Sequence, residues 1–475
     1  MKHLNLSGSV LIQLLIAGII CSFFGCSSTG NSKPNFILIF CDDMGYGDLG
    51  CYGSTVNSTP EIDRMAKEGI LFSDFYVTSG VCTPSRASLM TGCYPLRVGM
   101  DENDRGYWVL FPGDRKGLNP AEITIAEILK EQGYSTACIG KWHLGDQREF
   151  LPTRQGFDYY YGIPYSNDMG NNGNDDNPNP PLPLMRNETV IEAPVNQSTI
   201  TQRYTQEAIA FITRNKDNPF FLYLPHTMVH YPLHSGDMFR GKSANGKYGD
   251  AVEEIDWSTG QILNTLHELE IAENTLVMFT SDNGATRSGS NAPLSGGKAG
   301  IMEGSMREPF IAWWPGHTGP PATCNELITS MDILPTLAYL SGGSVPSDRI
   351  IDGKNIYSLL TAEEGASSPH EVFYYYFMSQ LQAVRSGEWK LFLPLEEKQY
   401  GWTRKIIKAE AQLFNLKDDP QEAVNVIDQH PEIVRRLMEY ADEARKDIGD
   451  FQKQGKNARP AGWVDDPEFR LIQDN

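Results

Sequence analysis

Two pairs of oxygen-bearing side chains follow apolar segments of the sequence. Asp42 and Asp43 follow the apolar run at residues 36–40, with Cys41 between them and the run. Asp282 and Asn283 follow a second run of this kind. One such pair is usually a turn or a helix cap, but two pairs at the ends of two predicted strands indicate a site. Carboxylate and amide oxygens bind hard cations, so the set suits Ca²⁺ or Mg²⁺ better than zinc.

A candidate nucleophile lies in the segment Cys82-Thr83-Pro84-Ser85-Arg86. Proline favours the first turn of a helix, so Cys82 is predicted at a helix N-terminus, where backbone N–H groups attract anions. Taken alone, such a cysteine is more often a small buried hydrophobic residue than a reactive group. The rest of the chain decides between these two interpretations.

The segment continues as Ala-Ser-Leu-Met-Thr-Gly at residues 87–92, and over residues 34–430 the chain resembles the type I, formylglycine-dependent sulfatases, of the arylsulfatase A and N-acetylgalactosamine-sulfatase kind. The resemblance implies that a maturation enzyme oxidises Cys82 to formylglycine, whose hydrate is the nucleophile. A geminal diol can expel sulfate by collapsing to the aldehyde, whereas a plain serine or cysteine ester needs a second attack at sulfur. The implied metal is Ca²⁺ in preference to Mg²⁺, and its implied ligands are Asp42, Asp43, Asp282, Asn283 and residue 82.

Further motifs match basic residues of the same family. Lys141 and His143 lie in Gly-Lys-Trp-His-Leu-Gly at residues 140–145, and Lys298 lies in Gly-Gly-Lys-Ala-Gly at residues 296–300. The resemblance implies that Lys141 binds formylglycine and sulfate, that His143 removes a proton to eject sulfate, and that Lys298 neutralises the leaving side. With the histidine of Val-His-Tyr-Pro at residues 229–232, the implied catalytic set is Cys82, Arg86, Lys141, His143, His230 and Lys298.

Two more residues complete the implied site, and one histidine is excluded from it. Ser166 resembles the sulfate-binding serine of the arylsulfatase A type, and Asn167 is the second predicted substrate-binding residue. His226 lies four residues before His230, a spacing that a zinc-binding helix uses. No glutamate follows His226, and Pro232 interrupts the segment, so we expect a structural role for His226.

The predicted activity is hydrolysis of sulfate monoesters. The expected substrate is a sulfated sugar at the end of a glycan, of the galactose or N-acetylgalactosamine type, because exported bacterial sulfatases of this type serve glycan breakdown. A small sulfate ester is also an expected substrate. The alternatives are a phosphomonoester or phosphonate hydrolase of the same superfamily, and a non-catalytic binder of sulfated glycans in which Cys82 is never oxidised.

Alternating strands and helices must position these residues. Apolar strands are predicted at residues 36–40, 134–139, 220–224 and 275–280, with helices at 60–68, 124–132 and 251–269 between them. This alternation predicts an α/β fold with a large, mostly parallel sheet between helices, and the resemblance implies the alkaline-phosphatase-like form. Polar residues follow all four strands, at the edge where open α/β sheets bind ligands.

The C-terminal part of the sequence has a different pattern of predicted elements. Short strands at residues 372–377, 383–384, 389–393 and 412–415 precede a helix at 431–447. We therefore predict a catalytic domain at residues 34–370 and a smaller α+β subdomain with an antiparallel sheet at 371–475. Residues 167–183, rich in Asn, Asp, Gly and Pro, are predicted as a long surface loop.

The N-terminus has the features of an export signal. Lys2 precedes an apolar run at residues 10–20, which is too short to span a bilayer. Residues 23–26 resemble a lipobox, so we expect a signal peptide at residues 1–25 and a lipid anchor at Cys26, with simple cleavage as the alternative. The predicted location is the periplasm or the outer membrane, as a lipoprotein. Six cysteines remain after Cys26, and all except Cys82 are expected to be small buried residues.

Charge and composition exclude several classes of partner. The 475 residues carry a formal net charge of −20, which argues against nucleic acids and anionic lipid surfaces as main partners. A hydrophobic fraction of 40% excludes disordered and fibrous classes. The predicted site is positive by contrast, because Arg86, Lys141, Lys298 and a divalent cation outweigh three aspartates. The overall charge would therefore slow the approach of polyanionic glycans without preventing their binding.

Overall fold

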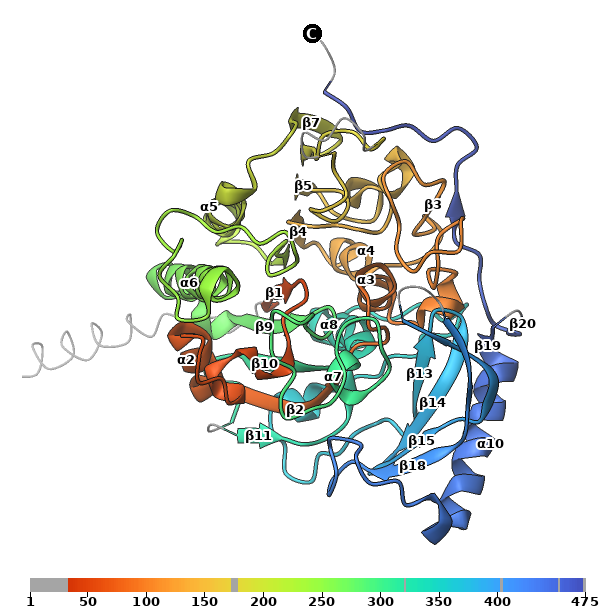
Figure 1. Cartoon of the computed structure of the whole chain (residues 1–475). Coiled ribbons are helices and arrows are strands. Elements are labelled where there is room, and N and C mark those ends of the chain that lie inside the picture. The colour runs from red at the N-terminus through yellow and green to blue at the C-terminus, as the bar shows by residue number, and fades with distance from the viewer. Residues whose placement is uncertain (1–32, 172–177, 320–321, 402–404, 452, 473–475) are drawn as a thin grey trace, which may run out of the picture. The chain divides into compact units, whose positions relative to one another are not determined.

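A mixed sheet of mostly parallel strands positions the predicted site residues (Figure 1). The computed structural model describes residues 33–171, 178–319, 322–401, 405–451 and 453–472. From edge to edge, the sheet consists of β11 (Ala322–Cys324), β2 (Ile70–Tyr76), β10 (Arg307–Trp313), β9 (Thr275–Ser281), β1 (Asn35–Cys41), β8 (Phe220–Pro225), β4 (Ser135–Ile139), β5 (Tyr159–Gly162), β6 (Leu184–Arg186) and β7 (Thr189–Glu192), and β12 (Ile328–Thr329) pairs with β2.

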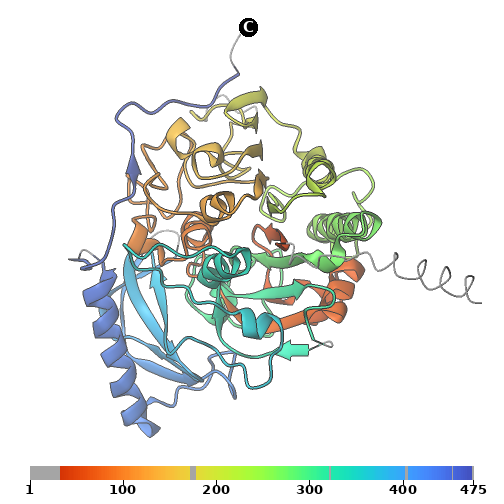
Figure 2. The same cartoon turned by 180° about the vertical axis from the view of Figure 1, so that it is seen from behind.

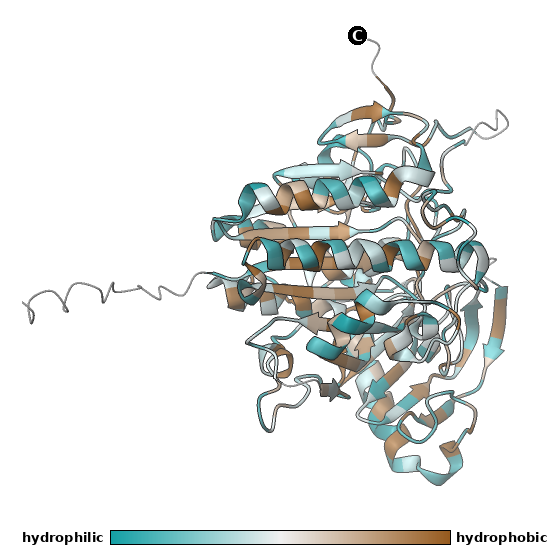
Figure 3. Ribbon diagram, turned by 90° about the vertical axis from the view of Figure 1, so that its left-hand side faces the viewer, coloured by the Kyte–Doolittle hydropathy of each residue, from teal (hydrophilic) through white to brown (hydrophobic). Residues whose placement is uncertain are grey.

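Successive residues of β1 face two different hydrophobic cores. Phe36 and Leu38 pack in the core that includes Leu89, while Ile37 and Ile39 pack in the core that includes Ile255. Because strand side chains alternate between faces, this central strand is buried on both sides. One face is covered by α2 (Pro60–Glu68), α5 (Ile200–Asn215) and α6 (Gly246–Glu268), and the other by α3 (Cys82–Thr91), α4 (Ile125–Glu131) and α8 (Ile333–Ser341). Figure 3 shows α5 and α6 side by side over their face of the sheet.

The register of the parallel strands brings their carboxyl ends to one edge. Cys41 at the end of β1 pairs with Ser281 at the end of β9, and Phe40 pairs with Pro225 at the end of β8. β4 runs parallel to β8 on its far side. The residues that follow these four strands therefore meet at one edge, as the sequence predicted.

A second, antiparallel sheet lies in the C-terminal part, and Figure 2 shows α10 along its outer side. Its strands are β13 (Phe373–Phe377), β14 (Gln380–Ser386), β15 (Trp389–Phe392) and β18 (Gln412–Asn415), and α10 spans Pro431–Asp447. Leu381 and Leu391 belong to the same hydrophobic core as Phe36, and the contacts place Pro34–Asn475 in one compact unit. The division at residue 370 stays a prediction.

The remaining elements are short. They are β3 (Lys116–Gly117), α7 (Glu303–Met306), α9 (Tyr357–Leu360), the hairpin strands β16 (Leu395–Tyr400) and β17 (Lys405–Ala409), and β19 (Gly449–Asp450), β20 (Lys453–Gln454) and β21 (Gly462–Trp463). Short 3-10 turns link several of these elements.

The predicted elements agree well with the observed ones. The fold class is confirmed, and the helix at 431–447 has the predicted bounds. The predicted helix at 251–269 begins five residues earlier, at Gly246, and the predicted strand at 383–384 extends over Gln380–Ser386. The ends of the predicted surface loop are buried, since Asn167 and Leu182 are both inaccessible to solvent.

Several predictions concern residues outside the described part of the chain. The signal segment at residues 1–25 and Cys26 lie there, as do residues 172–177 of the predicted loop. Within the described residues, no helix is long and apolar enough to span a membrane. In the same part of the chain Cys41, Cys51, Cys82, Cys93, Cys138 and Cys324 are all free thiols; Cys51 and Cys324 are only half-buried.

Candidate active site

Four oxygen-bearing side chains gather at the ends of β1 and β9. The backbone N–H of Asp43 donates to Asp282 Oδ1 at 3.1 Å, and Asn283 Nδ2 donates to Asp43 Oδ1 at 2.8 Å. Asp43 has a φ of 62°, a left-handed conformation that a non-glycine residue adopts at a cost. All four side chains, including Asp42, are buried.

This cluster fits a hard cation. Asn283 Oδ1 is buried and accepts no hydrogen bond from the described residues. Single oxygens of Asp42 and Asp282 lie within 4.8 Å of each other and of Cys82 Sγ, as expected for ligands around one ion. Burial and the neighbouring Asp42 raise the pKa of the Asp282 carboxyl to about 7, so the neighbours of Asp282 do not fully compensate its charge. An oxygen-rich donor set of this kind suits Ca²⁺ or Mg²⁺.

Cys82 begins α3, as predicted. Its Sγ lies 3.5 Å from Asp42 Oδ1 and 3.7 Å from Lys298 Nζ, and the side chain is buried. Burial raises the pKa of the thiol well above its usual value, although Lys141 and Lys298 act in the opposite direction. An unmodified Cys82 is therefore a thiol at neutral pH and a poor nucleophile.

Arg86 lies one helical turn after Cys82 and points into the same cluster. Its Nη2 lies 2.7 Å from Asp282 Oδ2 and 3.5 Å from Asp42 Oδ1. Its Nη1 donates to the carbonyl of Lys141 at 3.0 Å, and its guanidinium lies over the ring of Phe40. The planar guanidinium group of Arg86 is fully buried and therefore rigid.

Two lysines contact the cluster. Lys141, which follows β4, contacts Asp42 Oδ2 at 2.5 Å and donates to Ser166 Oγ at 3.2 Å. Lys298 lies in a glycine-rich loop and contacts Asp43 Oδ1 at 2.7 Å. Despite their burial, Asp42 raises the pKa of Lys141 and Asp43 raises that of Lys298, so both are cations at neutral pH. Together with Arg86 they provide three fixed positive charges.

His143 also lies close to α3. Its Nε2 contacts the carbonyl of Leu110 at 3.0 Å, and Thr83 Oγ1 donates to the carbonyl of His143 at 3.1 Å. Its Nδ1 is buried and makes no hydrogen bond with the described residues. Burial, followed by the charges of Lys141 and Arg86, holds its pKa well below the usual value. His143 is therefore a neutral imidazole with one free acceptor nitrogen.

The Nδ1 atom of His230 contacts two acceptor oxygens. Its Nδ1 lies 3.0 Å from Asn167 Oδ1 and 2.6 Å from the carbonyl of Tyr231, so Nδ1 carries the hydrogen. Its Nε2 faces Asp43 Oδ2 at 3.7 Å. The Asn167 amide also donates to Gln197 Oε1 and to the carbonyl of Pro232, so Asn167 orients His230 here. Its predicted contact with substrate stays a prediction.

His226 follows β8 at the same edge of the sheet, but its ring makes no hydrogen bond to this cluster among the described residues. It is fully buried, and its Nε2 contacts Ser258 Oγ on α6 at 3.5 Å. Burial lowers its pKa to about 4. Among the described residues it forms no group with metal-ligating neighbours.

Several supporting residues were missed by the sequence analysis. Leu110 acts through its backbone carbonyl, Thr83 through its hydroxyl and Gln197 through its side-chain amide, and none of these contacts has a signal in the sequence. Glu303 has a signal, because it belongs to a Glu-Gly pair shortly after Lys298. It is fully buried and paired with Lys390 of the C-terminal sheet at 3.0 Å.

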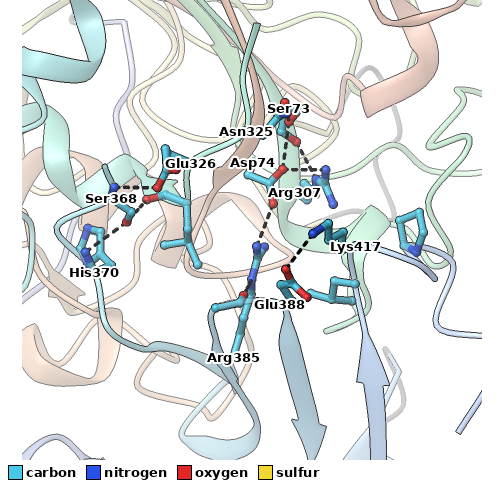
Figure 4. Close-up of a pocket in the computed structure, with 14 residues that line it drawn as sticks. Ser73, Asp74, Arg307, Asn325, Glu326, Ser368, His370, Arg385, Glu388 and Lys417 are labelled. Carbon is cyan, nitrogen blue, oxygen red and sulfur yellow. Dashed lines mark hydrogen bonds and ion pairs between the residues drawn. The ribbon is translucent and has the colours of Figure 1, made fainter. Parts of the chain in front are cut away.

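Two sizeable cavities lie beside the C-terminal sheet. One, of about 680 Å³, is lined by Asp74, Arg307 and Arg385 among others (Figure 4). Arg307 and Arg385 both pair with Asp74 at 2.9 Å, so these charges join the two sheets. The other, of about 570 Å³, is lined by the Lys298 loop and therefore adjoins the cluster.

Known proteins share both parts of this chain. Residues 34–343 match the family model described as Sulfatase, and residues 368–466 match the one described as the C-terminal region of aryl-sulfatase. Steryl-sulfatase of Homo sapiens is 39% identical over 446 residues, covering 76% of each chain. N-acetylgalactosamine-6-sulfatase of Canis lupus familiaris is 41% identical over 392 residues, covering 78% of this chain and 74% of that protein. Arylsulfatase A of Homo sapiens is 38% identical over 431 residues, covering 83% of each.

Solved structures agree with these relatives. A structure described under the metabolism of multiple glycosaminoglycans by Bacteroides thetaiotaomicron has a TM-score of 0.77 at 30% identity, covering 87% of this chain and 99% of that one. A sulfatase from Pseudoalteromonas sp. has a TM-score of 0.79 at 28% identity, covering 87% and 90%. The phosphonate monoester hydrolase of Agrobacterium radiobacter, at 18% identity and a TM-score of 0.59, shares the fold alone. The chain belongs to the sulfatase family and is a sulfuric ester hydrolase.

Proposed function

We propose that this protein is an exported, calcium-dependent sulfatase that removes sulfate from a sulfated sugar. The observation that carries the proposal is the junction of β1, β9 and α3. There residue 82 lies beside a cluster of buried oxygen-bearing side chains that could hold a cation, and beside three buried basic side chains. Hydrolysis of such esters is very slow without catalysis, so a rigid and densely charged site is required.

We propose that a maturation enzyme converts Cys82 to formylglycine. The raised pKa of the unmodified thiol supports this, because a buried thiol of that kind would attack sulfur poorly. As its hydrate, the aldehyde supplies a hydroxyl nucleophile and a second hydroxyl through which sulfate is later expelled. Lys298 and Lys141 favour an anionic oxygen at this position.

Asp42, Asp43, Asp282, Asn283 and residue 82 would hold the cation. We propose Ca²⁺ in preference to Mg²⁺, because several carboxylates crowd one site whereas Mg²⁺ usually keeps most of its water. When bound, the cation stabilises negative charge on a sulfate oxygen.

The protein's own side chains bind and orient the ester. Arg86, Lys141 and Lys298 neutralise the sulfate oxygens, and Ser166 donates from its place beside Lys141. Lys298 donates to the leaving oxygen, and His230, whose ring is fixed at Nδ1, directs Nε2 towards the same oxygen and donates there once Nε2 is also protonated. His143 takes a proton at Nδ1, the nitrogen that has no partner among the described residues.

The proposed substrate is a sulfated sugar unit at a glycan end. Relatives named N-acetylgalactosamine-6-sulfatase support a sugar of the galactose or N-acetylgalactosamine type. A structural neighbour described under glycosaminoglycan metabolism supports a glycan substrate. We further propose that the protein leaves the cytoplasm through its N-terminal signal and is anchored to the outer membrane by a lipid at Cys26.

The proposal is tested by peptide mass spectrometry over residue 82 combined with a panel of substrates. We expect formylglycine in protein co-expressed with a maturation enzyme, and sulfate release from sulfated galactose or N-acetylgalactosamine. The matched phosphate esters should react far more slowly, and the Cys82→Ala variant should release no sulfate. Binding of sulfated glycans without sulfate release, by protein shown to carry formylglycine, would refute the proposal.

A further inference from the structure

The cavity of about 570 Å³ beside Lys298 has no role in the chemistry described so far. It lies between the glycine-rich loop at residues 296–302 and the strands β14, β15 and β18. Because Lys298 lines it and also contacts Asp43 and Cys82, the cavity adjoins the position of the ester. A group attached to the leaving oxygen can therefore extend into it.

The walls of this cavity suit a sugar ring. Phe392 and Phe414 line it and meet edge to face, with ring centroids 5.7 Å apart. Gln382 also lines it and is 1% exposed. Its Nε2 donates to Gln380 Oε1 and to the carbonyl of Gln399, which leaves Oε1 buried without a partner among the described residues. Apolar faces and an unused buried acceptor match the C–H face and hydroxyl groups of a sugar.

The charges of the cavity favour an anionic ligand. Arg287 and Lys398 line it, and no carboxylate of the described residues forms an ion pair with either side chain. Glu422 is the one acidic residue among the described lining residues, and it is already paired with Lys390 at 2.7 Å. Burial, followed by the charge of Lys390, lowers the pKa of Lys398, an effect that a bound anion would offset.

We propose that this cavity binds the glycan beyond the cleaved sulfate, and that Arg287 and Lys398 bind a second anionic group of the same glycan. That group is a further sulfate or a carboxylate, which have the same charge and similar hydrogen-bonding oxygens. The proposal rests on the proposed function and narrows its substrate class to glycans with at least two anionic groups.

The test compares sulfated disaccharides that differ only in the neighbouring sugar, which is neutral, sulfated or a uronic acid. We expect wild-type protein to have a higher kcat/KM on the two dianionic substrates than on the monoanionic one. In Lys398→Met and Arg287→Met the ratio of these kcat/KM values should fall by about tenfold, because each removes one charged contact. Lys408→Met is the control, since Lys408 lies on the same hairpin but pairs with Glu396 and Glu410.

A binding measurement separates this proposal from the proposed function. Calorimetric titration of the Cys82→Ala variant with the same disaccharides needs no sulfate release. The same titration is made with two double variants, which carry Lys398→Met or Lys408→Met in addition to Cys82→Ala. Weaker binding of the dianionic disaccharides in the Lys398→Met double variant, with unchanged binding in the Lys408→Met one, would support the subsite even if the wild-type protein proved inactive. Unchanged kcat/KM ratios and unchanged binding in both Lys398→Met and Arg287→Met would overturn the subsite while leaving the sulfatase activity intact. Preference for only one dianionic substrate would identify the second group as sulfate or carboxylate.

Discussion

One hydrogen bond sets the tautomer of His143. A carbonyl oxygen only accepts, so the contact between Nε2 and the Leu110 carbonyl places the hydrogen on Nε2. Nδ1 then carries a lone pair in a fully buried position. The low pKa keeps the ring neutral near neutral pH, so Nδ1 is available there as a proton acceptor.

This state predicts the acid side of the pH profile. Activity that depends on neutral His143 should persist below pH 6.5 and fall only as the pH drops through its lowered pKa. We expect His143→Ala to lose about 10²- to 10⁴-fold in kcat, the usual contribution of a general acid or base. The measurement is kcat against pH for both proteins. An acid limb at or above pH 6.5 that disappears in the variant would contradict the lowered pKa.

At the scale of elements, strand ends could be predicted well from the sequence. The apolar runs before Asp42, His226 and Asp282 are continuous, so each indicated a buried parallel strand, and the strand before Lys141 was recognised although it includes Ser135 and Thr136. Parallel strands bring their carboxyl ends to one edge, and this alone placed the candidate ligands together. The start of α3 followed from Pro84 in its first turn.

Contacts between distant elements could not be predicted in this way. Asn167 is bound to His230 across 63 positions of sequence, and no local pattern encodes such a pair. Lys390 looked like an ordinary polar residue of a short strand, yet it is fully buried. Its burial depends on Glu303 and Glu422, which come from two other segments. Long-range ion pairs of this kind appear only once the two sheets are packed together.

Lys390 joins the C-terminal sheet to the loop that carries Lys298. Its Nζ donates to the carbonyl of Ile301 at 2.8 Å and pairs with Glu303 and Glu422 at 3.0 and 2.7 Å. The backbone N–H of Glu303 donates in turn to Glu422 Oε2. Although burial acts against it, Lys390 and nearby arginines lower the pKa of Glu303 to about 2. Lys390 of the C-terminal sheet therefore holds Ile301 and Glu303, which follow Lys298 closely in the chain, and so helps to position Lys298.

Lys390→Met should affect both stability and activity. The substitution removes the positive charge that pairs with the buried carboxylates of Glu303 and Glu422, and such a loss lowers the free energy of unfolding by about 3–5 kcal/mol in similar cases. We also expect kcat to fall by about tenfold or more, since small displacements of a positioned group are costly. Circular dichroism identifies a temperature at which the variant is folded, and kcat is compared there. Lys417→Met, at an exposed pair with Glu388, is the control. A folded Lys390→Met protein with wild-type kcat would limit Lys390 to a structural role.

For the whole molecule, the cation site joins segments that are far apart in sequence. Its proposed ligands lie around residues 42, 82 and 282, on three elements of the central sheet and its covering helix. A ligand that binds only the folded state stabilises it, by about 2.7 kcal/mol at a hundred times its dissociation constant. The proposed cation should therefore stabilise the complete fold.

Chelation should accordingly lower the melting temperature, by about 3 °C or more, and added Ca²⁺ should restore it better than Mg²⁺. Asp282→Asn should reduce the response to Ca²⁺. Asp237→Asn, at an exposed position paired with Arg240, should keep it. Differential scanning calorimetry measures all three proteins. An equal Ca²⁺ response in Asp282→Asn would remove Asp282 from the proposed ligands.

Global stability also depends on pH through His226, which titrates in the opposite direction to several buried carboxyls. Its pKa is about 4 in the folded protein and 6.5 by reference, so the unfolded chain binds more protons between these values and stability falls as pH falls from 6.5 to 4. At pH 4.5 the loss from this residue is about 2–3 kcal/mol. Burial raises the pKa values of Glu254 and Asp256 to about 7, so their contributions to the stability of the folded protein fall as pH rises instead.

His226→Gln separates these contributions, because the carboxyls are common to both proteins and cancel in the difference. At pH 7.5 the variant should be less stable than wild type, through imperfect packing beside Ser258. Between pH 6.5 and 4.5 the gap should narrow by about 2 kcal/mol, since only the wild-type chain has a buried imidazole to protonate. Urea denaturation midpoints at several pH values measure the gap. A gap that stays constant across this range would show that His226 keeps its ordinary pKa in the folded protein.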